Sequence, residues 1–330
     1  MSSFPKTLAR GVDTLMDRTV APGYTKIGSA VRRRLPGWPA DPAPDALSGR
    51  TVAVTGATSG LGFATAEGLA RLGADVRLVV RDVEKGARCQ ARLEAAVPGV
   101  DVTVDRCDVS DLDDVRRFAR ELEVERIDVL VHNAGAMPAQ RTESAQGHEL
   151  SMALHVLGPV LMTELLRPVL GGHPPDSDSR VLLVTSGGMY GQRLRADDPE
   201  FTLGDYSPTT AYARSKRAQV ELLPVLARRW SEVGIGVHAT HPGWADTPGV
   251  ADSLPTFHRL TGPLLRDAAG GADTTVWLAA TRPQPSSGRL WHDRRARPTH
   301  LLRRTRTGEA ERTELWDWAR DQTGLAEVTG

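Results

Sequence analysis

The chain has 330 residues, 40% of them apolar and 25% charged, which is the composition of an ordinary globular protein with a sizeable core. Lysine plus arginine and aspartate plus glutamate both number 41, so the formal net charge is zero and gives no support to nucleic-acid or acidic-membrane binding. The two cysteines form no metal-binding or disulfide motif, and we expect no membrane-spanning run and no signal peptide, which favours a cytoplasmic protein without a metal.

Residues 1–49 are expected to form an extension in front of the main domain. Leu8, Val12 and Leu15 recur at helical spacing, and three arginines follow at 32–34. This pattern favours a helix that packs on the body of the protein or on a second subunit, with peripheral membrane attachment as the alternative. Four prolines between residues 36 and 44 then predict a stiff linker.

From residue 50 to about 300, short β-branched runs alternate with longer helical patterns. Such alternation predicts a parallel sheet covered by helices on both faces, which is a single three-layer, doubly wound α/β domain of the Rossmann type. Residues 301–330 are expected to form a charged tail, with Trp316 and Trp318 as docking points. The expected strands are 51–55, 75–80, 102–105, 127–131, 181–185 and 235–240, and the clearest helical patterns are 62–72, 112–122 and 150–170.

A glycine-rich turn joins the first expected strand to the first expected helix. A helix N-terminus presents unpaired N–H groups and a positive partial charge, and glycines let the backbone approach a ligand closely. The turn therefore predicts a pyrophosphate site, although a purely structural turn would also contain glycines. The candidate cofactor-binding residues of the turn are Gly56, Thr58, Ser59, Gly60, Leu61 and Gly62.

The spacing TGxxxGxG of this turn resembles that of the short-chain dehydrogenase/reductase family. Four later segments complete the resemblance in family order: His132-Asn133-Ala134-Gly135, Ser186, Tyr212-Ala-Arg-Ser-Lys216, and Pro242-Gly243 with Thr247. Longer phrases, such as Ser186-Gly-Gly-Met189 and Gly271-Ala-Asp-Thr274, resemble the member-twelve-like subgroup. The resemblance implies an oxidoreductase that transfers a hydride between a nicotinamide cofactor and a small-molecule alcohol or carbonyl compound.

The tip of the second strand bears on the choice of cofactor. An acidic residue there binds the ribose diol of NAD, whereas a nearby arginine accommodates the 2′-phosphate of NADP. Val80 takes the acidic position in the family alignment, so Arg81 favours NADP(H) over NAD(H), with Asp82 left as a competing acid or as a helix cap. The resemblance also places the cofactor against Asp108, Val109, Asn133, Ala134 and Gly135, and its nicotinamide against Pro242, Gly243, Trp244 and Thr247.

Tyr212 and Lys216 are the expected centre of catalysis. They are four residues apart, so on a helix they project from the same face. A phenol has a pKa of roughly 10, and an adjacent ammonium is expected to lower it and make Tyr212 an acid or base near neutral pH. The resemblance also implies that Lys216 binds the ribose of the cofactor and that Ser186 hydrogen-bonds the substrate oxygen. Thr185, the preceding residue, is the alternative to Ser186 in that role.

The fourth catalytic position departs from the family pattern, because His155 stands where asparagine is usual. In the family, the backbone carbonyl of that residue holds a water that leads to the lysine. Pro159 has no N–H, so a helical carbonyl four residues earlier, that of His155, would lose its partner. We hypothesise that this free carbonyl replaces the asparagine, and we expect His155→Asn to leave turnover nearly unchanged. A proton-relay imidazole and a degraded site are the alternatives.

The sequence defines the residues around the substrate less specifically than those around the cofactor. Between Ser186 and Tyr212 lies an acidic stretch, 193–206, which is expected to be either a solvated loop or a partial lid. Pro255, Phe257 and Leu260 lie where the family covers its substrate, and they favour an apolar one. The leading hypothesis is an active enzyme; the alternative is an NADP-binding regulatory or scaffold protein with lapsed catalysis. Relatives often dimerise through the helix of the catalytic tyrosine, so a homodimer is also an expectation.

Overall fold

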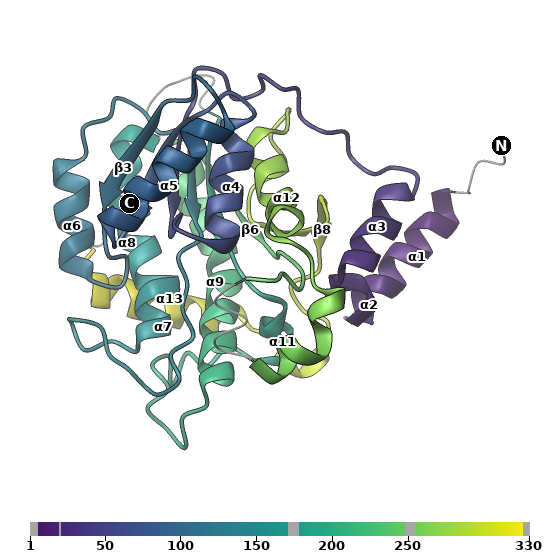
Figure 1. The fold of residues 1–330 in the computed structure, drawn as a ribbon. Helices are drawn as coiled ribbons and strands as arrows, with labels where there is room; N and C mark the ends of the chain where they lie inside the picture. The colour runs from purple at the N-terminus through teal and green to yellow at the C-terminus, as the bar shows by residue number, and fades with distance from the viewer. Residues whose placement is uncertain (1–5, 20, 171–177, 248–254, 326–330) are drawn as a thin grey trace, which may run out of the picture.

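The computed structural model describes residues 6–19, 21–170, 178–247 and 255–325 (Figure 1). Its centre is one eight-stranded sheet in the order β3-β2-β1-β4-β5-β6-β7-β8, in which the first seven strands are parallel and β8 runs antiparallel to β7. The strands are β1 Thr51–Thr55, β2 Asp75–Val80, β3 Val102–Arg106, β4 Val129–His132, β5 Ser179–Val184, β6 Ile235–Thr240, β7 Arg289–His292 and β8 Arg295–Arg297.

Helices cover both faces of the sheet and enclose two cores. One core lies between the sheet and α4 (Gly60–Ala70), α5 (Val83–Ala96) and α12 (Ala268–Ala280). The other lies under α6 (Leu112–Glu121), α8 (Gly158–Leu170) and α9 (Pro208–Ser231), with α13 (Glu309–Thr323) packed on α9. The predicted three-layer, doubly wound α/β fold is confirmed.

Strand order reverses at β1, which lies between β2 and β4. In open parallel sheets the connections on the two sides of such a point lead to opposite faces, and a crevice opens at the carboxyl ends of the strands. The glycine-rich turn after β1 and the Asn133 segment after β4 meet at this place, because β1 and β4 are paired in register. The fold therefore brings two of the predicted motifs together.

The edge of the sheet contains a hairpin that the sequence pattern did not predict. Strands β7 and β8 have four and three residues and are joined by Asp293 and Arg294, which both adopt positive φ values, +49° and +54°. Two-residue hairpin turns of this kind usually carry Asn-Gly or Asp-Gly, and here Arg294 takes the place of the glycine. With an incomplete turn signal, and with strands this short, the hairpin left no clear trace in the sequence.

The stretch 150–170, expected as one helix, is divided into three. Leu150–Met152 (α7) is followed by a turn of π-helix, Ala153–Leu157 (η1), and then by α8. By length and composition alone Leu150–Leu170 is apolar enough to cross a membrane, so the expectation of no membrane-spanning run stays a prediction. Most of its apolar part is buried inside the protein, as in a core helix of a globular fold.

The N-terminal extension folds into α1 (Lys6–Arg18), α2 (Ala21–Tyr24) and α3 (Lys26–Arg34), which lie beside β8 (Figure 1). Arg32 of α3 is buried and forms ion pairs with Asp13 of α1 (2.9 Å) and with Asp293 of the β7–β8 turn (2.7 Å). The proline-rich linker continues over the body, where Ala40 accepts a hydrogen bond from the Trp277 indole (3.2 Å). The extension is thus packed on the domain through buried charges.

The last described helix, α13, covers part of α9. Leu315 and Ala319 are buried in that contact, and the Arg229 guanidinium lies 5.3 Å from the centre of the Trp316 ring. Helix α9 continues through Pro224. Part of the α9 surface that the homodimer expectation concerned is therefore occupied by this chain's own C-terminal helix.

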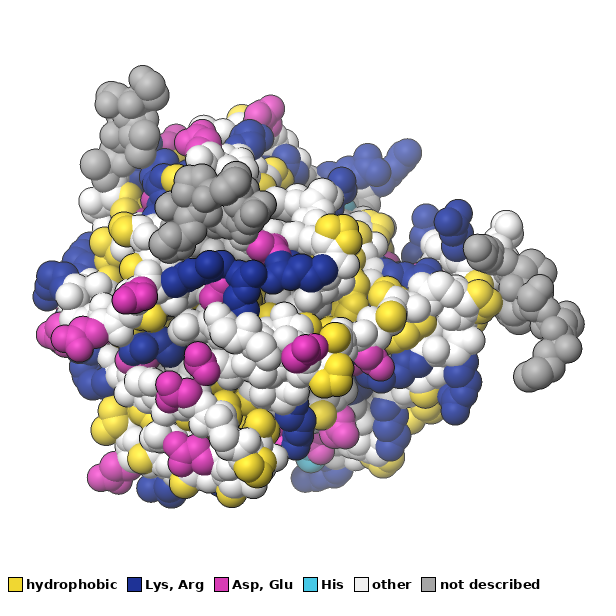
Figure 2. Space-filling model, turned by 90° about the horizontal axis from the view of Figure 1, so that it is seen from above, with side chains coloured by type: hydrophobic (Ala, Val, Ile, Leu, Met, Phe, Trp, Pro, Cys, Tyr) yellow, Lys and Arg dark blue, Asp and Glu magenta, His cyan; other side chains and the backbone are white. Residues whose placement is uncertain are grey.

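Charges of both signs are interspersed over the surface seen from above, with apolar side chains between them (Figure 2). This mixture agrees with the equal numbers of acidic and basic residues in the chain.

Candidate active site

The glycine-rich turn has the backbone that its sequence predicted. Gly56 and Gly60 adopt positive φ values, +65° and +51°, and α4 begins at Gly60 with Ser59 as its N-cap. A Cβ on Gly62 would collide with the carbonyl oxygen of Gly56 and with the amide nitrogen of Asn133. Ser59 makes no side-chain hydrogen bond to the first turn of α4 within the described chain. The first amides of the helix are therefore not occupied by a capping side chain.

Asn133 braces this turn. Its side-chain amide donates to the carbonyls of Thr55 (3.1 Å) and Gly56 (3.3 Å). The hydroxyl of Thr55 in turn accepts hydrogen bonds from the backbone N–H groups of Asn133 and Ala134, both at 3.0 Å. Sequence reasoning named Asn133 but missed the role of Thr55, although Thr55 is the first letter of the TGxxxGxG motif.

The tip of β2 presents a cation. Val80 is buried, whereas the side chain of Arg81 is 77% exposed and reaches to 3.8 Å from the carboxylate of Asp108. Asp82 is the N-cap of α5 and accepts a hydrogen bond from the N–H of Lys85 (3.0 Å). Of the two readings of Asp82, the structure supports the helix cap.

The loop after β3 brings the predicted adenine-side residues close to α8. Asp108 accepts hydrogen bonds from the backbone and side chain of Ser110 (3.0 and 2.6 Å). Val109 is buried, and its carbonyl oxygen lies so close to Gly158 that a Cβ there would collide with it. Gly158 is therefore required for α8 to begin against this loop.

Tyr212, Lys216 and Ser186 meet behind the carboxyl end of β5. The ammonium of Lys216 is buried, donates to the carbonyl of Val184 (2.8 Å) and lies 5.6 Å from the centre of the Tyr212 ring. The Ser186 hydroxyl lies close enough to the Tyr212 phenol to lower the pKa of that phenol. Thr185 instead donates to the carbonyl of Lys216 (3.1 Å) in the interior, so Ser186 rather than Thr185 shares the site with the phenol.

The pKa values of the pair differ from the sequence expectation. Burial raises the pKa of Tyr212 to about 12, and the neighbouring Ser186 hydroxyl opposes that shift. Burial also lowers the pKa of Lys216 to about 7. Desolvation disfavours both charged forms, and it outweighs the attraction between ammonium and phenolate that we expected to dominate. At neutral pH, Tyr212 is therefore a neutral phenol.

His155 is held beside Tyr212 as a neutral imidazole. Its Nδ1 lies 2.8 Å from the hydroxyl oxygen of Ser215, and that hydroxyl donates to the carbonyl of Tyr212 (2.8 Å). Because a hydroxyl has one proton to give, Ser215 must accept from His155, so Nδ1 carries the hydrogen. Burial and the neighbouring Lys216 lower the pKa of His155 well below 6.5. Its Nε2 is then an acceptor, and it has no hydrogen-bond partner among the described residues.

The π-helical turn alters the backbone acceptors around His155. The N–H of Gly158 donates to the carbonyl of Ala153, five residues back. In an α-helix the N–H of Gly158 would donate to the carbonyl of Leu154, and the N–H of residue 159 would donate to the carbonyl of His155, but Pro159 has no N–H. Neither carbonyl has its α-helical donor. The hypothesis of a free His155 carbonyl stays a prediction, and this turn is its structural basis.

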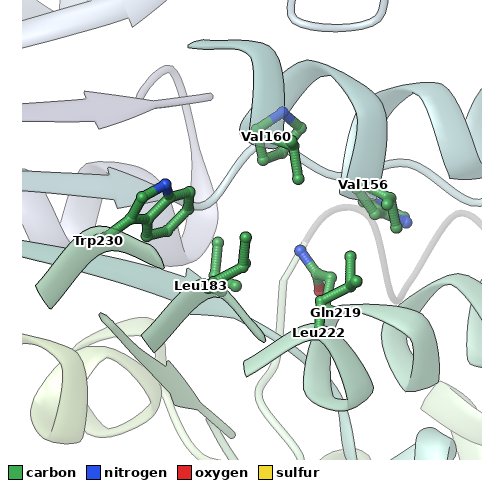
Figure 3. A pocket seen from close by; sticks show the side chains of 9 residues that line it. Val156, Val160, Leu183, Gln219, Leu222 and Trp230 are labelled. Carbon is green, nitrogen blue, oxygen red and sulfur yellow. The ribbon is translucent and has the colours of Figure 1, made fainter. Parts of the chain in front are cut away.

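A small cavity lies behind the π-turn, between α8, α9 and β5 (Figure 3). Most of its lining is apolar, with Val156, Val160 and Leu183 among the contributors. His155 and Gln219 also line it, and each keeps one buried polar atom without a partner in the described chain. Buried polar groups of this kind are commonly satisfied by a single internal water.

The loop after β6 carries the predicted nicotinamide-side residues Pro242, Gly243, Trp244 and Thr247. Gly243 has a φ of +79°, and its N–H donates to His241 (2.9 Å). The N–H of Trp244 donates to the carbonyl of Tyr24 in the N-terminal extension (2.8 Å). Sequence reasoning missed Tyr24, because nothing in the pattern around it indicates a partner more than 200 residues away.

The segment 193–206 is tied to the body of the protein. Glu200 accepts from the imidazole of His148 (2.8 Å), and the phenol of Tyr206 donates to Glu149 (3.0 Å). Asp198 is buried and accepts from the backbone of Thr202 (2.7 Å). These contacts do not fit a freely solvated loop, whereas a partial lid stays a prediction. The side chains of Pro255, Phe257 and Leu260, expected on the substrate side, lie outside those that the structure describes.

A doubly wound sheet with a glycine-rich turn at its switch point, and a Tyr–Lys pair with a serine beside it, defines the class of Rossmann-fold oxidoreductases. The short chain dehydrogenase family profile matches residues 50–194. The chain is 38% identical to dehydrogenase/reductase SDR family member 12 of Bos taurus over 301 residues, which cover 88% of this chain and 91% of that protein. It is 33% identical to retinol dehydrogenase 12 of Bos taurus, over 84% of this chain and 88% of that protein.

Among solved structures, the Pseudomonas aeruginosa RhlG/NADP active-site complex is 25% identical, with a TM-score of 0.60, over 75% of this chain and 96% of that one. The chain belongs to the short-chain dehydrogenase/reductase family, in the group that resembles member 12. It is therefore an NAD(P)-dependent oxidoreductase that acts on alcohol or carbonyl groups, which confirms the family resemblance found in its motifs.

Proposed function

We propose that this protein is an NADP(H)-dependent oxidoreductase of apolar carbonyl compounds and the corresponding alcohols. The observation that carries the proposal is the cluster of Ser186, Tyr212 and Lys216 at the carboxyl end of β5, in which the Lys216 ammonium lies 5.6 Å from the centre of the Tyr212 ring. The apolar substrate class is supported by the similarity to a retinol dehydrogenase.

The residues present suit a dinucleotide carrying an additional phosphate. The first amides of α4 and the close backbone around Gly62 would hold a pyrophosphate, since a helix N-terminus favours negative charge. The exposed guanidinium of Arg81 at the tip of β2 would pair with a 2′-phosphate, while Val80 cannot bind a ribose diol. When bound, the nicotinamide supplies or accepts the hydride.

The chain's own residues handle the proton. In carbonyl reduction, the phenol of Tyr212 gives its proton to the substrate oxygen, which the Ser186 hydroxyl also contacts. The phenolate left behind is reprotonated by the ammonium of Lys216, whose pKa of about 7 allows proton exchange near neutral pH. Because Tyr212 has a pKa of about 12, it is present as the acid that this direction needs.

Turnover and nucleotide binding test this function separately. The purified protein is incubated with NADPH or NADH and a panel of apolar ketones, aldehydes and quinones, beside Tyr212→Phe. We expect turnover with NADPH, and a loss on the order of a hundredfold or more in Tyr212→Phe, the usual size of a lost acid catalyst. Tight NADPH binding without turnover on the whole panel would instead favour the regulatory or scaffold alternative.

The cofactor preference has its own control. We expect Arg81→Ala to weaken NADPH binding about tenfold and to leave NADH binding unchanged, because the guanidinium meets only the additional phosphate. Equal binding of NADH and NADPH by the unaltered protein would overturn the NADP assignment and leave the oxidoreductase class in place.

A further inference from the structure

Tyr24 is the residue through which the N-terminal extension reaches the active-site edge of the sheet. It ends α2, is 1% exposed, and is followed by Thr25, the N-cap of α3. Its place between two short helices directs both its carbonyl and its ring into the domain. Each of these groups contacts a loop that borders the catalytic site.

The carbonyl of Tyr24 holds the loop that follows β6. It accepts hydrogen bonds from the N–H of Trp244 (2.8 Å) and from Nε of Arg266 (3.0 Å). A Cβ on Gly243 would stand 2.8 Å from this oxygen and 2.6 Å from Arg266 Nε, so the extension closes directly on the loop backbone. The position of the Pro242–Trp244 backbone thus depends on a carbonyl from the extension.

The ring of Tyr24 touches both flanks of the site. It packs edge-on against His241, which precedes the loop, and against His292 of β7, with ring centroids 4.4 and 5.1 Å apart. A Cβ on Gly187, the residue after Ser186, would lie 3.0 Å from the Tyr24 ring. One side chain therefore lies between the serine segment and the loop after β6.

Buried charges fix Tyr24 in this place. Arg32 donates to the carbonyl of Gly23 (2.7 Å) and to Asp293 (2.7 Å). Asp293 also pairs with Arg266 (2.6 Å), which donates to the same Gly23 carbonyl at 3.2 Å. The backbone at 23–24 is consequently held from both sides by guanidinium groups, and both of these are buried.

From these contacts we infer that Tyr24 is a positioning residue for the cofactor: the N-terminal extension holds the Pro242–Trp244 backbone in the shape that receives the nicotinamide. The inference rests on the proposed function, because that function makes this loop the nicotinamide site. It predicts that loosening Tyr24 weakens the nicotinamide half of cofactor binding and leaves the adenosine half unchanged, because the glycine-rich turn and Arg81 lie on other elements.

The test compares Tyr24→Leu with Tyr24→Phe. The phenylalanine variant is the matched control, since the Tyr24 hydroxyl has no hydrogen-bond partner within the described chain. Dissociation constants are measured for NADPH and for 2′-phospho-ADP-ribose, which lacks the nicotinamide. We expect Tyr24→Leu to weaken NADPH binding about tenfold and 2′-phospho-ADP-ribose binding less than about twofold, with Tyr24→Phe like the unaltered protein.

Hydrogen exchange of the Trp244 amide gives a readout that does not involve a ligand. We expect it to be protected in the unaltered protein and in Tyr24→Phe, and to exchange faster in Tyr24→Leu. Arg266→Lys removes the Nε donor but keeps a cation beside Asp293. We expect it to weaken NADPH binding more than 2′-phospho-ADP-ribose binding, as Tyr24→Leu does, and it replaces Tyr24→Leu in the test if that variant does not fold.

Equal losses for both nucleotides, or no loss for either, would overturn the positioning role, and so would an unprotected Trp244 amide in the unaltered protein. If the unaltered protein binds neither nucleotide, the proposed function fails instead, and the exchange result still decides whether the extension holds the loop.

Discussion

At the scale of single residues, His155 is the departure that most affects the mechanism. Its ring stands edge-on to that of Tyr212, with centroids 5.3 Å apart, and its proton lies on Nδ1, directed at Ser215. Since its pKa lies well below 6.5, the imidazole carries no charge with which to stabilise a phenolate at neutral pH. Its backbone carbonyl and the space it fills are then the properties that matter.

We therefore expect His155→Asn to keep kcat within about threefold of the unaltered protein, far less than the loss of an acid catalyst costs. An asparagine N–H can replace the hydrogen bond to Ser215, and the backbone is unchanged. Steady-state kinetics with the best substrate of the panel checks this, with Tyr212→Phe as the inactive reference. A hundredfold drop would show that the imidazole itself takes part in proton transfer.

Lys216 makes a pH-dependent contribution to stability in the protein without nucleotide. Burial lowers its pKa from 10.5 to about 7, so between these values the unfolded chain binds a proton that the folded chain does not. The free energy of unfolding must then rise with pH across this window, by at most about 1.4 kcal/mol per pH unit, and level off below pH 7.

Lys216→Met removes this dependence. We expect the variant to be the more stable protein at pH 7, and its advantage to shrink as the pH approaches 9.5, below the region where Tyr212 titrates. Urea denaturation at a series of pH values measures the difference. A difference that stays constant with pH would mean that Lys216 keeps an ordinary pKa in the fold.

At the scale of elements, the π-turn Ala153–Leu157 either frees the His155 carbonyl for the lysine or has a structural role alone, and one substitution distinguishes the two. Pro159→Ala supplies the α-helical N–H donor that Pro159 cannot give to the His155 carbonyl, and it allows an ordinary α-helix across the turn. If a free carbonyl serves the lysine, turnover should fall about tenfold, the worth of one hydrogen bond, while the melting temperature stays equal or rises.

Thermal melts beside kinetics distinguish this outcome from simple misfolding. Unchanged turnover in Pro159→Ala would show that the carbonyl is dispensable. Together with a harmless His155→Asn, that result would leave this turn with a purely structural role.

The sequence predicted the elements whose signals are local. Strands such as Thr51–Thr55 and Ile235–Thr240 are buried β-branched runs, and the expected bounds agree with the structure. From Pro159 the sequence predicted a lost helical hydrogen bond but not the π-turn, because the register of the turn depends on how α8 starts against the carbonyl of Val109. The β7–β8 hairpin was missed, since Arg294 adopts a positive φ where such a turn usually has glycine, so Asp293 alone gives no clear turn signal.

The same division holds in the site. Gly56, Tyr212 and Lys216 could be found because each belongs to a motif with fixed spacing. Ser215 and Thr55 stand inside those motifs, yet their roles as hydrogen-bond bridges follow only from which strand and helix they face. The pKa of Tyr212 could not be predicted either, because burial, which sets it, is a property of the whole fold.

At the scale of the whole molecule, the extension is joined to the domain by charges far apart in the sequence. Asp13 pairs with Arg32 and with Arg297, and Asp293 pairs with Arg32 and Arg266, all of them buried. A run of arginines in the sequence does not reveal which acids it will meet. Buried pairs of this kind make the extension and the sheet edge one cooperative unit, because separating them would leave buried charges without a partner.

Arg32→Met tests that unit. The substitution leaves Asp13 and Asp293 buried with one cation fewer, so we expect the free energy of unfolding to fall by about 3 kcal/mol, with little change between 0.1 and 1 M salt. Arg193→Met is the matched control: its pair with Glu311 lies on the surface, and its loss should cost at most about 1 kcal/mol. If the two variants lose equal stability, the extension is only loosely attached, and the single unfolding transition expected here should then split into two.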